Sequence, residues 1–521
     1  GKKLFTWGDG DFGKAWANNL TDKDGPYVEL MTGVYTDNQP DFSWIQPYET
    51  KVFEQYWYPI RKIGVVKNAT IDAAVSFEVE NGNASIGFNT TGVFKQSTVI
   101  LKYHEKVLYE RKIDISPKDP FTAKVKLPSE EIDEQGLEVL LVSNDEKILV
   151  SYKPVKRGEK KPPETRLPAL PPKEIETTEE LYINGLHLEQ YRHHTYDPKE
   201  YYLEALKRDN EDIRCNNAMG MLEFRNGKFD AAERYFRKAM KRLISRNDNP
   251  YDTEVFYNLG LVLKMTGRYD EAYKYFYKAV WHYSWRSAGY YALAEISARK
   301  GDLETALNEI NFSLATNTDS VKGRNLKTVI LRKLGRTEEA LEMAKETAKT
   351  DLIDIWSRYE IYTICKNTGK MDEAAKILEE IKVKVRNNAE YFIDVAIDYS
   401  NAGFYEDAIN ILSDADGKYP MVNYYMGYYY EQIGDAQKAL EYYKLAEQKP
   451  SDYCFPNRLD SINVLKCAQN MNPAGAKAFY YLGNLYYDKF RYEEAIENWE
   501  KSRALDENFA IVHRNLGIAY F

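Results

Sequence analysis

The sequence predicts a multidomain protein with an all-β N-terminal part followed by an all-α superhelix. Short alternating strand patterns fill residues 66–152, a segment rich in proline and charge covers 153–178, and a helical repeat occupies 179–521. A chain of 521 residues is also too long for one hydrophobic core. We therefore expect three or so units, with the helical repeat as the largest.

The repeat is recognised by an alanine that recurs every 34 residues, at Ala272, Ala306, Ala340, Ala374 and Ala408. Turns such as "MTGRYDEA" and "NTGKMDEA" accompany it and occur eight times. Glycine ends the first helix, where a left-handed residue is needed, and an acidic residue opens the second, where the helix dipole favours negative charge. The pattern and its period resemble the tetratricopeptide repeat. About nine hairpins are expected, the last one truncated, in a superhelix with a concave face.

The resemblance implies a binding groove lined by the first helix of each hairpin. The position two residues before Leu259 is expected to point into this groove, and a tyrosine occupies it in five repeats, at Tyr257, Tyr291, Tyr359, Tyr424 and Tyr480. Tyrosine is rigid, apolar and able to form hydrogen bonds, so the row predicts a bound protein or peptide. The alternative is that these residues pack between helices, since the chain has 43 tyrosines. Some members of the repeat family bind C-terminal carboxylates through Lys and Asn; tyrosine stands in the Lys position here, which argues against that ligand.

Residues 66–152 carry alternating segments such as "TIDAAVSFEVE" and "LEVLLVSNDEKILVSY", about ten residues apart and separated by turn sequences. This spacing indicates an immunoglobulin-like sandwich. No cysteine pair lies in the segment. We expect it to act as a spacer or a platform.

Residues 1–65 contain Glu29 in "YVELMTG", Asp37 in "YTDNQP" and a "QPYET" turn before further aromatic residues. This order resembles the C-terminal end of galactose-mutarotase-like domains, the β-supersandwich of aldose epimerases, with tyrosine replacing the glycine of the turn. It is also similar to an uncharacterised bacterial group in which such a domain precedes tetratricopeptide repeats. The resemblance covers about 60 residues.

That resemblance implies a carbohydrate site. Glu29 would be the catalytic base at the anomeric hydroxyl, and Trp7, Asp37 and Trp44 would contact the sugar. The chemistry also needs a proton donor opposite the base, a histidine in the epimerases, and the first histidine of this chain is His104. We therefore expect this chain to be inactive alone and a longer parent protein to act on or sense sugars. The alternatives are that Glu29 is scaffolding, and that the protein is a pure interaction scaffold.

Composition and short motifs argue against several other classes of function. The net charge of -9 argues against nucleic acid as a partner. The four cysteines form no CxxC or CxxH pair, so no metal site is expected, and no motif indicates a cofactor. No apolar run approaches a membrane span. The chain opens at Gly1 and ends at Phe521 inside a helical pattern, so we expect both ends to be cut; the compartment stays open, with the cytoplasm favoured.

Overall fold

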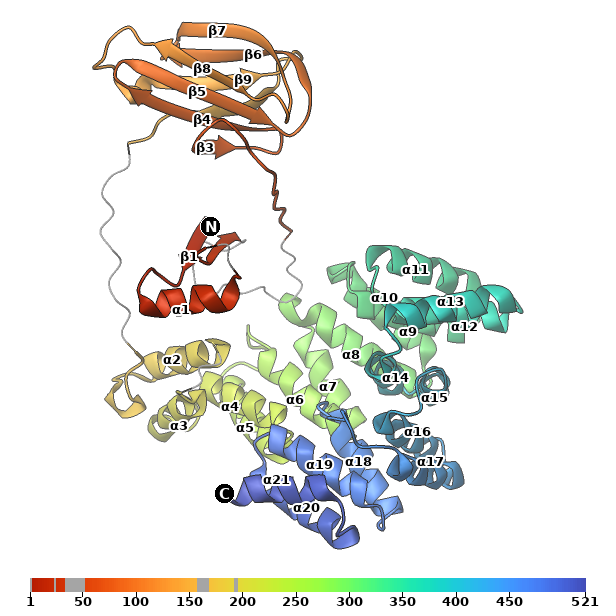
Figure 1. Cartoon of the computed structure of the whole chain (residues 1–521). Helices are drawn as coiled ribbons and strands as arrows, with labels where there is room; N and C mark the ends of the chain where they lie inside the picture. Colours follow the sequence, from red (N-terminus) through yellow and green to blue (C-terminus); the bar gives the residue numbers. More distant parts are fainter. Residues whose placement is uncertain (1, 23–24, 33–51, 157–167, 192–194) are drawn as a thin grey trace. The chain divides into compact units, whose positions relative to one another are not determined.

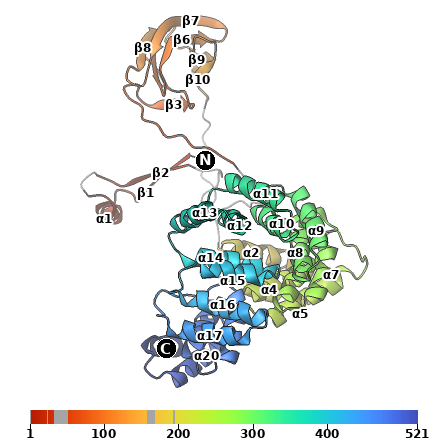
Figure 2. The same ribbon diagram turned by 90° about the vertical axis from the view of Figure 1, so that its right-hand side faces the viewer.

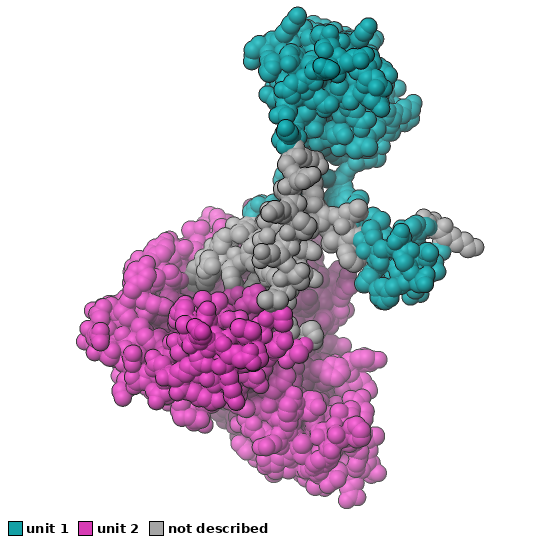
Figure 3. Space-filling model, turned by 90° about the vertical axis from the view of Figure 1, so that its left-hand side faces the viewer, with its two compact units in different colours: residues 1–45, 49–167 teal, residues 46–48, 168–521 magenta. Residues whose placement is uncertain are grey.

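The computed structural model describes residues 2–22, 25–32, 52–156, 168–191 and 195–521. The chain divides into two compact units (Figure 3), one of residues 1–45 and 49–167 and the other of residues 46–48 and 168–521. Strands dominate the first unit and helices the second. The predicted domain boundaries at residues 65, 152 and 178 stay predictions.

The first unit begins with strands β1 (Lys2–Thr6) and β2 (Val28–Thr32), which pair antiparallel. Helix α1 (Asp11–Leu20) lies between them in sequence. It is an addition to the all-β expectation for this part of the chain. The indole of Trp7, just after β1, stacks on that of Trp16 in α1 with ring centroids 4.9 Å apart. Aromatic contact between strand and helix thus accounts for part of the aromatic content that the sequence shows here.

A sandwich of two antiparallel sheets follows. Its strands are β3 (Val66–Ala69), β4 (Ala73–Glu80), β5 (Asn83–Thr90), β6 (Phe94–Tyr103), β7 (Lys106–Ile115), β8 (Phe121–Lys126), β9 (Leu137–Val142) and β10 (Ile148–Tyr152), with the 3-10 turn η1 (Glu134–Gly136) before β9. The strand orders are β3-β4-β5-β8 and β10-β9-β6-β7. The chain crosses between sheets after β5, β7 and β8, as in immunoglobulin-like sandwiches, which confirms the expected fold.

Alternation builds the core of this sandwich. Val99 and Leu101 of β6 and Val139 and Leu141 of β9 are fully buried and meet the inward residues of the opposite sheet, including Phe88. Successive side chains of a strand point to opposite faces, so every second residue enters the core.

The second unit is all helical. After the 3-10 turn η2 (Pro172–Glu174) it contains α2 (Thr178–Tyr191), α3 (Pro198–Arg208), α4 (Ile213–Arg225), α5 (Phe229–Leu243), α6 (Glu254–Met265), α7 (Tyr269–Ala279), η3 (Tyr283–Trp285), α8 (Arg286–Arg299), α9 (Leu303–Thr316), α10 (Val321–Lys333), α11 (Thr337–Thr350), α12 (Trp356–Asn367), α13 (Met371–Lys384), α14 (Ala389–Asn401), α15 (Tyr405–Ser413), α16 (Pro420–Gln432), α17 (Ala436–Gln448), α18 (Asp460–Met471), α19 (Ala476–Asp488), α20 (Tyr492–Leu505) and α21 (Ala510–Tyr520). Among the described helices, none combines the length and the apolar character needed to cross a bilayer.

Each predicted hairpin is present. The eight repeated turns join α4–α5, α6–α7, α8–α9, α10–α11, α12–α13, α14–α15, α16–α17 and α19–α20. Helices α2 and α3 form a further hairpin at the start of the helical repeat, and α21 begins another. Small residues set the contact within a hairpin: a Cβ on Gly260 of α6 would lie 2.6 Å from the ring of Phe276 in α7. The same relation holds between Gly220 and Phe236 in the preceding hairpin.

One helix stands outside the hairpin pattern. The alanines at 439 and 495 are 56 residues apart, well above the 34-residue period, and the extra sequence forms the single helix α18 and the loop before it. Helix α18 packs against α16 and α19. Figures 1 and 2 show the array curving so that α14 comes to lie near α8 and α18 near the end of α6.

Candidate partner-binding sites

Three members of the predicted tyrosine row are buried. The hydroxyl of Tyr359 donates to Asp414 Oδ2 at 2.8 Å, and that of Tyr424 donates to Glu447 Oε1 at 2.6 Å. Tyr480 is also buried. In this conformation these side chains pack between helices, because the array curves tightly enough for neighbouring elements to cover them. Partner binding by these three residues stays a prediction.

The other two tyrosines of the row are only half-buried. Tyr257 of α6 stacks on Trp285 with ring centroids 4.8 Å apart. Tyr291 of α8 lies among acidic groups that include Glu295 and Asp398. Burial raises the pKa of Tyr291 well above the usual value, and these negative charges raise it further. Asp398 belongs to α14, so Tyr291 faces the interior between the two halves of the array.

The interior is closed where the end of α8 meets the turn between α14 and α15. Arg299 Nε donates to the Asn401 carbonyl at 3.2 Å, and its guanidinium also donates to the Ser400 carbonyl and the Tyr405 hydroxyl. A Cβ on Gly403 would lie 2.8 Å from the Cα of Arg299. The two backbones therefore approach as closely as glycine permits.

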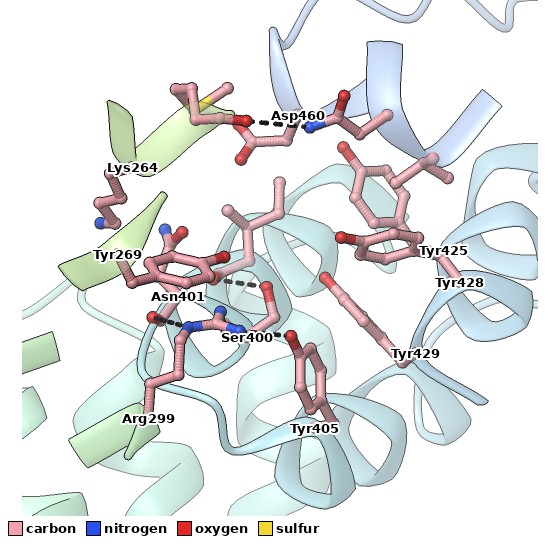
Figure 4. A pocket seen from close by; sticks show the side chains of 14 residues that line it. Lys264, Tyr269, Arg299, Ser400, Asn401, Tyr405, Tyr425, Tyr428, Tyr429 and Asp460 are labelled. Carbon is pink, nitrogen blue, oxygen red and sulfur yellow. Dashed lines mark hydrogen bonds between the residues drawn. The ribbon is translucent and has the colours of Figure 1, made fainter. Parts of the chain in front are cut away.

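A small cavity of about 60 Å³ lies beside this contact (Figure 4). Tyr269, Arg299, Tyr405 and Asp460 are among its lining residues, and Figure 4 shows Arg299 reaching toward Tyr405 and Ser400. The cavity is large enough to hold water.

A second closure joins the turn between α4 and α5 to α18 and to the start of α20. Arg491 Nη1 donates to the Gly227 carbonyl at 2.8 Å, and Asn463 Nδ2 donates to the Met265 carbonyl at 3.3 Å. A Cβ on Gly227 would lie 2.7 Å from the side chain of Ile462. Gly227 has a φ of 69°, so it serves both the left-handed turn and the close approach.

Next to this second closure is an open hollow of about 500 Å³, hereafter the seam cleft. It is lined by Gly227, Lys228, Phe229, Asp230, Ala231, Arg234, Met265, Thr266, Ile462, Asn463, Lys466, Arg491 and Glu494. These residues come from the α4–α5 turn and α5, the end of α6, α18, and the start of α20. The sequence reasoning missed the seam cleft; the wide alanine spacing signals an insertion, but not where the inserted helix packs.

Positive charge exceeds negative charge in the seam cleft. Arg491 forms a double hydrogen bond with the carboxylate of Glu494, one arm measuring 2.6 Å. This contact lowers the pKa of Glu494, and the charges of Lys228 and Lys466 add to the effect. Within the described part of the chain, Lys228, Lys466 and Arg234 form no ion pair.

At the N-terminus, Glu29 lies on β2 and is half-buried, opposite Phe5 in the strand pairing. Val28 beside it is 49% exposed. The hydroxyl of Tyr27 donates to Glu29 Oε1 at 2.7 Å. Tyr27 and Trp7 both line a hollow of about 330 Å³.

Asp37 and Trp44, the other two residues predicted to contact a sugar, lie outside the described residues. The structure therefore brings Trp7 and Tyr27 to one hollow, with Glu29 joined to Tyr27 by a hydrogen bond.

The described residues contain no group of three or more His, Cys, Asp or Glu side chains placed to hold a metal ion. All four cysteines are free thiols. Burial raises the pKa of Cys454 to about 12 and that of Cys467 to about 11. Both groups are thus protonated thiols at neutral pH and poor nucleophiles.

Family comparisons match both units. Residues 212–280 and 394–453 match families described as tetratricopeptide repeat, and residues 483–521 match one described as TPR repeat. Residues 68–152 match the second domain of YphG-like proteins. Residues 1–60 match a domain of unknown function, DUF5107.

Solved structures with similar folds include a tetratricopeptide repeat protein from Parabacteroides merdae, at 14% identity and a TM-score of 0.33, covering 60% of this chain and 100% of that one. PilF of Pseudomonas aeruginosa matches at 20% identity and a TM-score of 0.35, covering 41% and 94%. The MamA protein matches at 21% identity and a TM-score of 0.30, covering 35% and 96%. With identities and scores this low, the assignment depends on the family matches and the repeated hairpins. The helical unit of this chain is a tetratricopeptide-repeat array.

Proposed function

We propose that this protein is a scaffold whose tetratricopeptide array binds a protein or peptide partner. Arrays of this kind present long continuous surfaces because each repeat contacts only its neighbours. The β-sandwich acts as a spacer or platform in this proposal. Partner binding by the array is common to both alternatives, the pure scaffold and the scaffold joined to a sugar-binding domain.

The observation that carries the proposal is the half-buried pair Tyr257 and Tyr291, at the same repeat position on α6 and α8. Half-buried aromatic side chains on a rigid helix offer contact area at little loss of conformational entropy, and they are frequent anchors of binding energy. Of the predicted row, these two are the members that are not fully buried in this conformation.

The test uses random peptides displayed on phage and selected on the whole immobilised chain. We expect a related set of peptides to be enriched and to bind the free chain in titrations. Replacing Tyr257 and Tyr291 together by alanine should weaken these peptides by roughly thirtyfold, the equivalent of one hot-spot residue of about 2 kcal/mol. Tyr277→Ala is the matched control, since this tyrosine of α7 is 52% exposed on the second helix of its hairpin.

Two results would count against the proposal. If selection enriches no related peptides, the array does not bind short segments and the scaffold proposal fails in this form. If enriched peptides bind the double variant as well as the wild type, the tyrosine site is wrong and the scaffold stands. Thermal unfolding of each variant shows whether a lost affinity reflects lost folding.

A second candidate function concerns the N-terminal residues, for which we propose a carbohydrate site. Its support is the hollow lined by Trp7 and Tyr27, together with the hydrogen bond from Tyr27 to Glu29. Indole faces stack on sugar rings, and a carboxylate accepts hydrogen bonds from sugar hydroxyls. Asp37 and Trp44 complete this proposed site on the resemblance alone.

Calorimetric titration with a panel of monosaccharides tests the carbohydrate site. At least one pyranose should bind, Trp7→Ala should abolish binding, and Glu29→Gln should weaken it while leaving the fold intact. In a longer parent protein with turnover, Glu29→Gln should reduce the rate by about 10²–10⁴-fold, because an amide cannot accept the proton. Heats equal to buffer across the panel would leave Glu29 as scaffolding.

A further inference from the structure

We infer that the seam cleft binds an acidic segment of a protein partner. This inference rests on the proposed scaffold function, and it assigns a site and a ligand chemistry that the tyrosine row does not provide. The seam cleft is formed by elements that are far apart in the repeat order, so it is distinct from the surface lined by Tyr257 and Tyr291.

The shape of the seam cleft suits a peptide side chain or a short stretch of chain. Its volume of about 500 Å³ lies within the range of ordinary ligand sites, about 300–1,000 Å³. Its walls combine the aromatic ring of Phe229 and the thioether of Met265 with cationic groups. Glutamate and aspartate within a peptide offer the matching combination of a short aliphatic stem and a carboxylate.

Charge decides the chemistry of the ligand. Four basic and two acidic side chains line the cleft, and Arg491 is already neutralised by Glu494. Lys228, Arg234 and Lys466 remain against one carboxylate, Asp230, which leaves a local excess of two positive charges. Charges more than about 8 Å apart are largely screened at physiological salt, so this local excess outweighs the net charge of -9 of the whole chain.

The start of α5 adds to the positive potential. Lys228 precedes the helix and provides no side-chain cap, and the first residues of the helix, Phe229 to Ala231, line the cleft. A helix N-terminus attracts negative charge. In combination with cations on α5 and α18, this favours a ligand that carries several carboxylates over one that carries a single charge.

The probe is a fluorescein-labelled hexaglutamate peptide, followed by fluorescence anisotropy on the full chain, with hexaglutamine as the neutral control. We expect hexaglutamate to bind more tightly than hexaglutamine, and its binding to weaken as NaCl rises from 50 to 300 mM. Lys228→Glu combined with Lys466→Glu should weaken hexaglutamate about tenfold or more, since like charges then face the peptide. The exposed single change Arg234→Glu should act in the same direction.

The matched control is Lys345→Glu combined with Lys376→Glu, which makes the same change of net charge on α11 and α13, away from the seam cleft. Its binding should stay within about twofold of wild type. Circular dichroism of both double variants checks that they fold. If the two double variants lose affinity equally, the peptide senses only the overall charge and the inference is overturned.

Two further outcomes would also overturn it. Wild-type chain that binds hexaglutamate no better than hexaglutamine has no acidic-segment site. Displacement of hexaglutamate by inorganic phosphate, beyond the effect of chloride at equal ionic strength, would identify a site for a small anion instead. Either result leaves the scaffold proposal intact if phage selection still yields peptides that depend on Tyr257 and Tyr291, so the two failures are distinguishable.

Discussion

Replacing Arg332 by methionine should destabilise the array by several kilocalories per mole. Arg332 of α10 donates from Nε and Nη2 to the Glu360 carboxylate at 2.7 and 2.9 Å, and from Nη2 to Asp407 at 2.8 Å. Glu360 is fully buried and Asp407 is 6% exposed. The hydroxyl of Tyr399 also donates to Glu360. One guanidinium thus joins α10, α12 and α15 across three hairpins.

The magnitude follows from what the substitution leaves behind. Methionine retains the aliphatic stem of arginine, so packing is largely preserved and the loss is one of charge and hydrogen bonds. Asp407 keeps Lys333 at 2.7 Å, whereas Glu360 loses its only cation among the described ion pairs. Removing one partner of a buried pair typically destabilises a protein by about 3–5 kcal/mol.

Arg336→Met provides the matched control. Arg336 makes an equivalent double contact with Glu339, at 2.7 and 2.6 Å, but the two side chains are 43% and 56% exposed. An exposed pair contributes about 0–1 kcal/mol. The two substitutions remove the same chemistry and differ in burial.

The assay is urea unfolding followed by far-ultraviolet circular dichroism and tryptophan fluorescence. Trp356 contacts Tyr399 edge-on, with ring centroids 5.4 Å apart, so part of the tryptophan emission comes from the affected hairpins. Because repeat arrays can unfold in segments, hydrogen exchange across α10 to α15 supplies a local measure. If the losses for Arg332→Met and Arg336→Met agree within about 1 kcal/mol, burial does not set the strength of this contact and the reasoning is wrong.

The remaining predictions address closure, packing and pH. Gly403→Ala should destabilise the array more than Gly369→Ala by about 1–3 kcal/mol. Both glycines have φ near 80°, so backbone strain is matched, but only a Cβ at position 403 would press against Arg299. Equal urea midpoints would show that this closure does not stabilise the fold. Ala340 is fully buried, so Ala340→Leu should overpack its hairpin and cost about 1–3 kcal/mol in urea unfolding; an unchanged midpoint would show spare volume there. Burial raises the pKa of Asp398 from 3.8 to about 6, so between these values the folded state holds a proton that the unfolded chain has released. The contribution of Asp398 to stability should therefore fall as pH rises through this window, so wild-type stability measured relative to Asp398→Asn should fall by at most about 3 kcal/mol. Asp398→Asn lacks that proton exchange, and a pH profile as steep as wild type would contradict the assignment.

The hairpins are predictable from sequence because their determinants are local. Gly260 accommodates Phe276 of the paired helix, and turn residues such as Gly369 adopt the left-handed conformation that ends a first helix. Both partners of each such contact lie within one repeat, so the 34-residue period records them. The alternating strands of the sandwich are predictable for the same reason, since burial of every second residue is a local pattern.

The candidate sites are less predictable. The sequence places Tyr257, Tyr291, Tyr359 and Tyr424 at one repeat position, yet two of them are half-buried and two are fully enclosed. Equal positions acquire different surroundings because the surroundings include helices from other repeats. For Glu29, the structure adds a hydrogen bond donated by the Tyr27 hydroxyl, which the order of motifs does not indicate.

The sequence by itself thus determined the repeat, its register and the order of β-sandwich and array, since all of these depend on contacts between residues close in the chain. Only the tertiary structure decided that the array closes on itself. Arg299 meets Asn401 across 102 residues, and Arg491 meets Gly227 across 264. The position of such contacts depends on small rotations between successive repeats, which add up along the array. No single repeat records that sum, so the seam cleft becomes visible only when the whole array is folded.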